Sequence, residues 1–260
     1  MAWVLDLDGV IWLADEPIPG AAAAVARLQS TGEAVAFVTN NSFTHRDRVV
    51  EKLARHGIDA QGQVYTSAMA AAGLVEPGSR ALVCAGPGVF AELAARGVET
   101  RDVGDEEAAD WEADVVVVGF HRSFDYRRMT VASTAVRNGA RLIAANTDST
   151  YPTPDGPIPG AGSILASIVT ASGVDPVVAG KPHEPIARMV RAALGPIGTV
   201  VGDRVDTDGA FARTLGYDFG LVFSGVTAAD RIPDGVTPDL MAPDLASLVH
   251  QALSERSGSN

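Results

Sequence analysis

Two aspartates, Asp6 and Asp8, stand two residues apart directly after a short apolar segment, Ala2 to Leu5. An apolar segment of this kind predicts a buried strand, and open α/β sheets bind ligands in the crevice at the carboxyl ends of their strands. Gly9 allows the backbone to turn sharply at this point. Because two carboxylates at one strand end repel each other, the pair predicts a bound cation, most simply Mg²⁺.

Three further groups of polar residues follow other apolar segments of the chain. Thr39, Asn40 and Asn41 come after one of them, Lys181 after a second, and the pair Asp203 and Asp208 after a third. The polar residues of all these groups could meet at one edge of a sheet. The lysine is informative, because Lys52 and Lys181 are the only lysines among 20 basic residues. A compact ammonium suits a tight phosphate site better than a planar guanidinium does.

In this order the four groups resemble the four-motif signature of the haloacid dehalogenase (HAD) superfamily of phosphatases. The resemblance covers essentially the whole chain and favours the NagD-like subgroup, which includes 4-nitrophenyl phosphatases, phosphoglycolate phosphatases and glycerol phosphate phosphatases. It implies an α/β fold, with a Rossmann-like core built on a parallel sheet and an inserted α/β cap domain of the C2a (type-IIA) kind.

The resemblance also implies roles for the residues of the first and third groups. Asp6 is the expected nucleophile, whose carboxylate attacks phosphorus and forms an aspartyl-phosphate. Asp8 is expected to protonate the leaving alcohol and then to deprotonate the attacking water. The negative charge of the phosphate and the aspartates exceeds the positive charge of Mg²⁺ and Lys181, which favours a proton on one carboxyl group.

The remaining implied roles concern the metal and the phosphate. The expected metal residues are Asp6, Asp8 through its backbone carbonyl, Asp203, and Asp208, which would hold a metal-bound water or orient a ligand. Phosphoryl oxygens are expected to meet Thr39, Lys181 and the backbone amides around Asn40 and Asn41. Each residue has an ordinary alternative, because an aspartate after a strand often caps a helix and Thr-Asn-Asn-Ser is good turn chemistry.

Apolar strands alternate with helical patterns along the chain, which is typical of parallel sheets. Residues 42–180 separate the second and third groups, far more than a single crossover connection needs. The expected organisation is therefore a discontinuous core, residues 1–77 and 179–260, interrupted by a cap at residues 78–178. Within the cap we expect a helix over residues 161–172, and where the cap returns to the core we expect a strand over residues 177–180 that leads into Lys181.

The segment from Ala145 to Pro152 resembles the part of these proteins that lies near the substrate-specificity loop. It departs from the usual Thr-Asn-x-Asp pattern, with Ala145 in place of the threonine. Tyr151 stands where pyridoxal phosphate phosphatase has a histidine that contacts substrate, which argues against pyridoxal phosphate as the substrate and makes Tyr151 a candidate substrate contact. The alternative for this tyrosine is a place in the cap core or in a dimer contact.

Composition narrows the partners of the protein. The formal net charge is −12 and the isoelectric point is about 4.7, so nucleic acid and anionic membranes are not expected to bind. The single cysteine, Cys84, favours a reducing compartment. No signal segment opens the sequence and no apolar run reaches membrane-spanning length, so we expect a soluble, cytoplasmic protein. The resemblance adds a possible homodimer formed through the cap.

The expected activity is a Mg²⁺-dependent hydrolysis of small phosphate monoesters of the glycerol phosphate, phosphoglycolate and 4-nitrophenyl phosphate class. A nucleoside monophosphatase or a sugar phosphatase on the same site is the alternative. Phosphomutase or dehalogenase chemistry is a second reading of the same core. Dehalogenases need no metal, so the presence of Lys181 with the paired Asp203 and Asp208 disfavours dehalogenase chemistry. A non-catalytic binding module is disfavoured, because Asp6, Asp8 and Lys181 are all present.

Overall fold

A computed structural model describes residues 1–151, 153, 156–233 and 235–257 of the chain. Pro152, at the end of the segment predicted to lie near the substrate, is outside the described residues. The chain forms two compact units: the first comprises residues 1–39, 49–65 and 187–260, and the second residues 40–48 and 66–186. The predicted division into a core of residues 1–77 and 179–260 and a cap of residues 78–178 stays a prediction.

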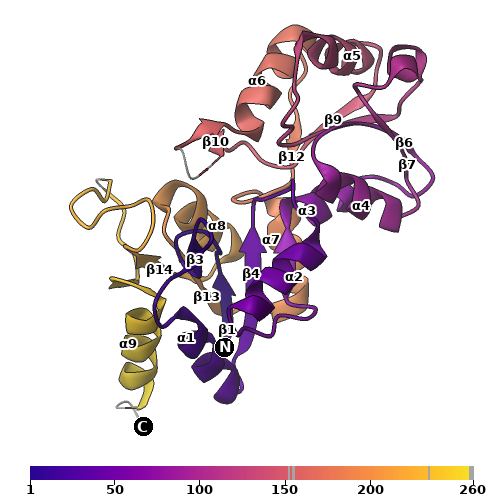
Figure 1. Cartoon of the computed structure of the whole chain (residues 1–260). Coiled ribbons are helices and arrows are strands. Elements are labelled where there is room, and N and C mark those ends of the chain that lie inside the picture. Colours follow the sequence, from indigo (N-terminus) through magenta and orange to yellow (C-terminus); the bar gives the residue numbers. More distant parts are fainter. Residues whose placement is uncertain (152, 154–155, 234, 258–260) are drawn as a thin grey trace. The chain divides into compact units, whose positions relative to one another are not determined.

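The first unit is built on a six-stranded sheet with the strand order β15-β14-β13-β1-β4-β5 (Figure 1). Strand β1 pairs in parallel with β13 on one side and with β4 on the other. Leu5, the last residue of β1, therefore lies between Val201 and Phe37. The strands are β1 (Ala2–Leu5), β4 (Ala34–Thr39), β5 (Val64–Thr66), β13 (Gly198–Gly202), β14 (Asp218–Val222) and β15 (Leu240–Ala242).

Burial explains why β1 forms the centre of this sheet. All four of its residues are buried, as expected for a strand that is covered on both faces. Trp3 and Leu5 belong to a core cluster that also contains Leu28 of α1 and Leu248 of α9. The helices are α1 (Ala21–Ser30), α2 (Arg46–Arg55), α7 (Glu184–Leu194), α8 (Ala210–Leu215) and α9 (Leu245–Ser257), and the short strands β2 (Trp12–Leu13) and β3 (Glu16–Pro17) form a hairpin.

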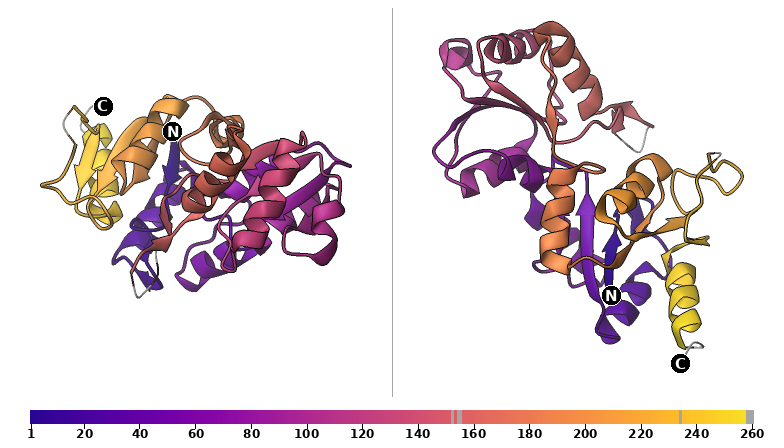
Figure 2. Two further views of the ribbon diagram at one scale, coloured as in Figure 1. Left: turned by 90° about the horizontal axis from the view of Figure 1, so that it is seen from above. Right: turned by 180° about the vertical axis from the view of Figure 1, so that it is seen from behind.

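The second unit contains a five-stranded parallel sheet with the order β12-β9-β8-β6-β7. Its strands are β6 (Arg80–Cys84), β7 (Glu99–Asp102), β8 (Val115–Val118), β9 (Arg141–Ala144) and β12 (Val177–Val178). Helices α5 and α6 pack together on one face of the sheet (Figure 2), where Val131 and Ile168 meet Leu82 and Val116. The other elements are α3 (Ser67–Gly73), α4 (Pro87–Ala95), α5 (Tyr126–Arg137), α6 (Ala161–Ser172), a 3₁₀ turn (Glu106–Asp110), and the paired strands β10 (Thr150–Tyr151) and β11 (Ile158–Pro159).

The predicted α/β fold class with parallel sheets is confirmed. Helix α6 has the predicted bounds. Helix α2 begins at Arg46, after a turn in which the Asn41 side chain accepts hydrogen bonds from the backbone N–H groups of Phe43 and Thr44. No helix within the described part of the chain has the length and apolar character needed to cross a membrane.

The sequence allows the polar residues of all four groups to meet at one edge of a sheet, but the strand before Lys181 belongs to the five-stranded sheet and not to the six-stranded one. Strand β12, which precedes Lys181, pairs with β9 and so extends the five-stranded sheet. The ladder continues beyond β12, because Ala179 N–H donates to Ala144 and Gly180 N–H to Ala145 at 2.8 Å each. The groups at Asp6, Thr39 and Asp203 follow β1, β4 and β13, which are neighbours in the six-stranded sheet.

Candidate active site

Three aspartates of the first unit bring their carboxylates together. Asp6 follows β1, Asp203 follows β13, and Asp208 lies on a π-helical turn formed by Val205–Gly209. One carboxylate oxygen from each aspartate lies within 4.8 Å of the other two. Asp203 is 3% exposed and Asp208 is fully buried. Like charges this close and this poorly solvated repel one another strongly, which favours a bound cation among them.

The chemistry of this donor set fits Mg²⁺. All three side chains offer carboxylate oxygens, the hard ligands that Mg²⁺ prefers, and no histidine or cysteine belongs to this cluster. Asp6 is half-buried, whereas the other two are buried. The group is therefore open on the side of Asp6, where a metal ion that keeps water or phosphate ligands needs access.

Asp8 uses its carboxylate differently. It is not one of the three clustered side chains, and its Oδ1 accepts a hydrogen bond from the indole Nε1–H of Trp12 at 3.0 Å. Asp8 is also exposed. Since the predicted contribution of Asp8 to the metal is its backbone carbonyl, the carboxyl group remains suited to proton transfer.

Glycines let the backbone approach the buried aspartates closely. A Cβ atom at Gly9 or at Gly225 would collide with the carboxylate of Asp203, and the N–H of Val226 donates to Asp203 Oδ2 at 2.6 Å. Sequence reasoning missed the part played by Gly225 and Val226. The available signal was a Ser-Gly pair soon after the buried strand β14.

The spacing of the Gly-Asp-x-x-x-x-Asp group has a similar explanation. A Cβ atom at Gly202 would overlap the side chain of Asp208, so glycine is needed for Asp208 to turn back over the end of β13. The N–H of Arg204 donates to Asp208 Oδ2 at 3.2 Å. Asp206, between the two buried aspartates, is exposed and pairs with Arg204, whose hydrogen bond lowers the pKa of the Asp206 carboxyl.

The predicted phosphate residues fall in both units. Thr39 is the buried last residue of β4, next to β1 in the six-stranded sheet. Asn40 begins the first segment of the second unit, where its Oδ1 accepts from the backbone N–H of Lys181 at 2.8 Å. The Asn40 Nδ2 donates to the Lys181 carbonyl and to Asp148 Oδ1, at 3.1 Å each. Both Asn40 and Lys181 are buried.

These bonds show that the Asn40 side chain holds the backbone on both sides of Lys181. The Asn40 carbonyl in turn accepts from Ser67 Oγ and Asn146 Nδ2 at 2.7 Å each. Sequence reasoning assigned only backbone amides to this region and missed this role of the side chain. The proposed contacts of Asn40 and Asn41 with phosphate stay predictions.

Tyr151 lies on β10 with its ring stacked on Phe120. The ring centroids are 4.2 Å apart and the planes differ by 6°, and Phe120 also contacts Phe43 edge-on. Tyr151 is half-buried, so part of the side chain remains accessible. The stacking fixes the ring plane, and the substrate contact predicted for Tyr151 stays a prediction.

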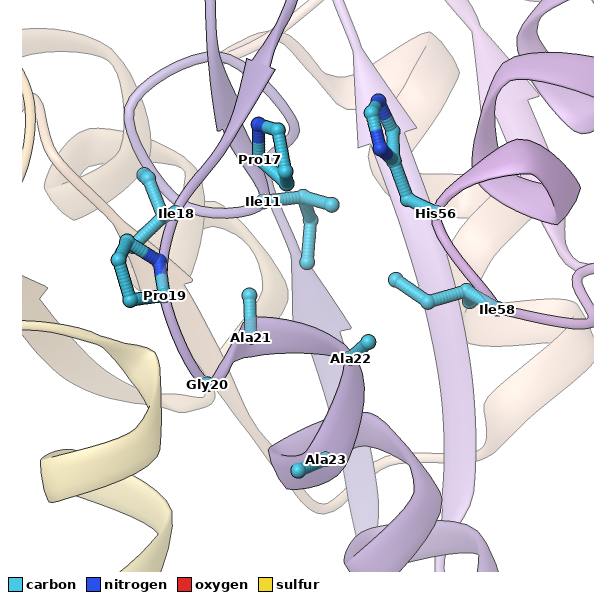
Figure 3. A pocket seen from close by; sticks show the side chains of 10 residues that line it. All are labelled: Ile11, Pro17, Ile18, Pro19, Gly20, Ala21, Ala22, Ala23, His56 and Ile58. Carbon is cyan, nitrogen blue, oxygen red and sulfur yellow. The ribbon is translucent and has the colours of Figure 1, made fainter.

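An apolar hollow of about 350 Å³ lies elsewhere in the first unit (Figure 3). Its wall is formed by Ile11, His56, Ile58 and residues 17–23, the last of these running from β3 into α1. None of the predicted catalytic, metal or phosphate residues lines it. With a single titratable side chain, this hollow lacks the charged groups that phosphate chemistry requires.

Comparison with known proteins agrees with this arrangement. Residues 3–99 match the family described as haloacid dehalogenase-like hydrolase, and residues 178–248 match a HAD-hydrolase-like family. An acid sugar phosphatase of Staphylococcus saprophyticus is 33% identical over 96% of this chain and 97% of its own length. A 5'-nucleotidase of Bacillus subtilis is 33% identical, with 93% and 94% covered. The D-glycerol 3-phosphate phosphatase of Mycobacterium tuberculosis is 37% identical over 87% of this chain, which spans 64% of that longer protein.

Solved structures of phosphatases are also similar to this chain. A p-nitrophenyl phosphatase from Archaeoglobus fulgidus has a TM-score of 0.88 at 32% identity, covering 96% of this chain and 98% of its own. A glycerol phosphate phosphatase from Mycobacterium tuberculosis, solved with magnesium and also with calcium, has a TM-score of 0.84 at 33% identity, covering 95% of this chain. That structure is covered over 75% of its length in the magnesium complex.

The chain belongs to the haloacid dehalogenase-like hydrolases. The relatives are phosphatases, which confirms the predicted NagD-like membership and the prediction of a phosphoric monoester hydrolase. The magnesium complex of the mycobacterial protein confirms magnesium as the expected metal of this group.

Replacing Gly225 with alanine tests the close backbone approach to the Asp203 carboxylate. The added Cβ overlaps the Asp203 carboxylate, so we expect phosphatase activity to fall by about 100-fold and more Mg²⁺ to be needed for half-maximal rate, because small displacements at an active site are costly. The matched control is Gly73→Ala, since Gly73 ends α3 and has open space around it. Equal activity and equal Mg²⁺ dependence in both variants would contradict this account of Asp203.

Proposed function

We propose that this chain hydrolyses small phosphate monoesters with Mg²⁺ through an aspartyl-phosphate on Asp6. The observation that carries the proposal is the cluster of Asp6, Asp203 and Asp208, two of them buried beside the end of β1. A buried group of three carboxylates is costly unless a cation neutralises it. Asp6 alone of the three is half-buried, as a nucleophile that must reach substrate needs to be.

Two aspartates divide the chemistry. A carboxylate oxygen of Asp6 forms a bond to phosphorus while the bond from phosphorus to the alcohol oxygen breaks, and Asp8 gives its proton to that oxygen. Asp8 then accepts a proton from the water that attacks the phosphoryl group, which frees Asp6 and releases phosphate. The separate environments of the two side chains support this division.

The proposed metal residues are Asp6, Asp203, Asp208 and the backbone carbonyl of Asp8. When bound, the divalent cation neutralises charge on these carboxylates and on the phosphoryl oxygens. Asp208 lies close against Gly202 and accepts a hydrogen bond from the Arg204 N–H, which supports its proposed role of holding a metal-bound water or orienting a metal ligand. Thr39 and the amides of Asn40 and Asn41 are proposed to bind phosphoryl oxygens.

Lys181 is proposed as the positive charge that stabilises the transferring phosphoryl group. A point charge of this kind offsets the negative charge that builds up on the phosphoryl oxygens in the transition state. Its burial and the paired hydrogen bonds from Asn40 to its backbone support a fixed position. Fixed charges stabilise a transition state without reorganising during the reaction.

For the substrate class we propose glycerol phosphate or phosphoglycolate, with nucleoside monophosphates and sugar phosphates as alternatives. The relatives support each of these except phosphoglycolate by name: one acts on D-glycerol 3-phosphate, one is an acid sugar phosphatase and one a 5'-nucleotidase. Tyr151, with Phe120 stacked behind it, is proposed to contact the part of the substrate beyond the phosphate.

We also propose a cytoplasmic homodimer that forms through the cap. The buried thiol of Cys84, whose pKa is raised by burial, is consistent with a reducing compartment. Val177, on the edge strand β12 of the second unit, is 46% exposed, and Val174, three residues before it, is 39% exposed, so both could meet a second copy. Light scattering during size-exclusion chromatography measures the mass of the protein in solution, and we expect the mass of a dimer. A monomer at every concentration would contradict the dimer.

The first test of the function is phosphate release from a panel of about thirty phosphate monoesters with Mg²⁺, comparing wild type with Asp6→Asn. We expect wild type to hydrolyse alkyl phosphates and 4-nitrophenyl phosphate, and Asp6→Asn to lose activity on the order of 10⁴-fold, because the amide is not a nucleophile. The ranking within the panel identifies the substrate class. A wild type that is inert on every compound would contradict the phosphatase proposal and favour a binding module.

Asn40→Asp tests the support of Lys181. The carboxylate cannot donate to the Lys181 carbonyl or to Asp148, so kcat should fall by about tenfold or more, since an unmet buried hydrogen bond costs about 1–3 kcal/mol. Asn138→Asp, at the exposed end of α5, is the matched control and should keep its activity. If Asn40→Asp lowers the melting temperature but leaves kcat unchanged, Asn40 supports only the fold.

A further inference from the structure

The carboxylate of Asp8 has a specific partner in the first unit. The indole Nε1–H of Trp12 donates to Asp8 Oδ1 at 3.0 Å. Trp12 is only 4% exposed, whereas Asp8 is exposed. A buried, rigid side chain thus holds one oxygen of an exposed carboxyl group, which limits rotation about the bond that carries it.

The backbone places Trp12 next to Asp8 by a tight turn. The N–H of Gly9 donates to the Trp12 carbonyl at 2.7 Å, and the N–H of Trp12 donates to the Leu7 carbonyl at 3.2 Å. Gly9 has a φ of +79°, which favours glycine. Trp12 then starts the β2–β3 hairpin by pairing with Pro17. The turn and the hairpin together fix the direction of the Trp12 side chain.

Helix α2 and the residue after it hold the indole ring. Lys52 Nζ lies 4.2 Å from the centroid of the Trp12 ring and donates to the Ala14 carbonyl at 2.6 Å. Lys52 also pairs with Asp15 at 3.2 Å, so it bridges the ring and the turn of the hairpin. The His56 ring lies 5.9 Å from the indole at 43°. A cation over an indole and an aromatic neighbour both restrict the ring plane.

We propose that Trp12 is a positioning residue, which orients the Asp8 carboxyl group for proton transfer to the leaving alcohol. The inference rests on the proposed function, in which Asp8 is the acid and base. Asp8 is exposed, and the hydrogen bond from the indole N–H favours one orientation of its carboxyl group. Lys52 and His56 act indirectly, because they contact the Trp12 ring and restrict its orientation.

A positioning role and a packing role predict different results. Loss of packing weakens the whole active site and lowers the rate for every substrate by a similar factor. Loss of orientation at Asp8 affects the transfer of a proton to the leaving group. It therefore affects substrates with a basic leaving group, such as alkoxide or phenolate, more than 4-nitrophenyl phosphate, whose leaving group departs without a proton.

The test measures kcat/KM for wild type and Trp12→Phe with three substrates: 4-nitrophenyl phosphate, phenyl phosphate and the fastest alkyl phosphate. This parameter reports the steps up to formation of the aspartyl-phosphate, before Asp8 acts as a base on water. Phenylalanine keeps an aromatic ring for Lys52 and His56 but has no N–H. We expect a fall of about tenfold or more for the alkyl and phenyl esters, and of no more than about twofold for the nitrophenyl ester.

Two further variants separate orientation from folding. Trp111→Phe makes the same substitution at a tryptophan of the second unit, whose ring lies under Arg80 and Arg101, and should leave all three rates unchanged. Benzothienylalanine at position 12 replaces the indole N–H with sulfur at nearly the same size. It should reproduce the selective loss of Trp12→Phe even if the phenylalanine variant is less stable.

The outcomes distinguish a failure of the proposed phosphatase function from a failure of the positioning role of Trp12. A wild-type chain that is inert on all three esters overturns the proposed function and this inference with it. An active wild type in which both Trp12 variants lower the three rates by one common factor, or lower none, overturns the inference alone. A selective loss on the alkyl and phenyl esters in both variants supports the role of Trp12.

Discussion

The structure of the site depends on the mutual repulsion of three carboxylates. Asp6, Asp203 and Asp208 each place an oxygen within 4.8 Å of the others, and two of them are buried. Such an arrangement is unfavourable unless a cation is bound and the backbone is fixed. Neighbouring strands β1 and β13 bring the first two together, and a π-helical turn over Gly202 brings the third. The same repulsion favours a bound divalent cation, which has to neutralise these carboxylates before an anionic phosphate can approach them.

Each unit holds its charged residues by a different arrangement of the backbone. The first holds the carboxylates at the ends of parallel strands, with glycines that permit close backbone approach. The second holds Lys181 after an edge strand of a different sheet, anchored by the side chain of Asn40. Backbone hydrogen bonds and the buried Asn40 amide help to position charge in both places, and fixed charge of this kind suits electrostatic stabilisation of a phosphoryl group.

Much of this could be predicted from local patterns, and the rest depends on long-range contacts. The apolar runs before Asp6 and Asp203 and the bounds of α6 follow from burial and periodicity. Local patterns could not predict which sheet the strand before Lys181 joins, because β12 has only two residues and its partner β9 lies far away in sequence. Gly225, the Asn40 side chain and the indole of Trp12 act through hydrogen bonds and close contacts that no spacing rule encodes.

The most direct measurement is the trapping of the covalent intermediate. Wild-type protein is mixed with Mg²⁺ and its best substrate, quenched in acid during turnover, and reduced with borohydride, which converts an aspartyl-phosphate into homoserine. Mass spectrometry of the peptides then locates the modified residue. We expect homoserine at position 6, formed only with substrate and Mg²⁺ present. Reduction at another aspartate, or rapid phosphate release with no modification at position 6, would contradict it.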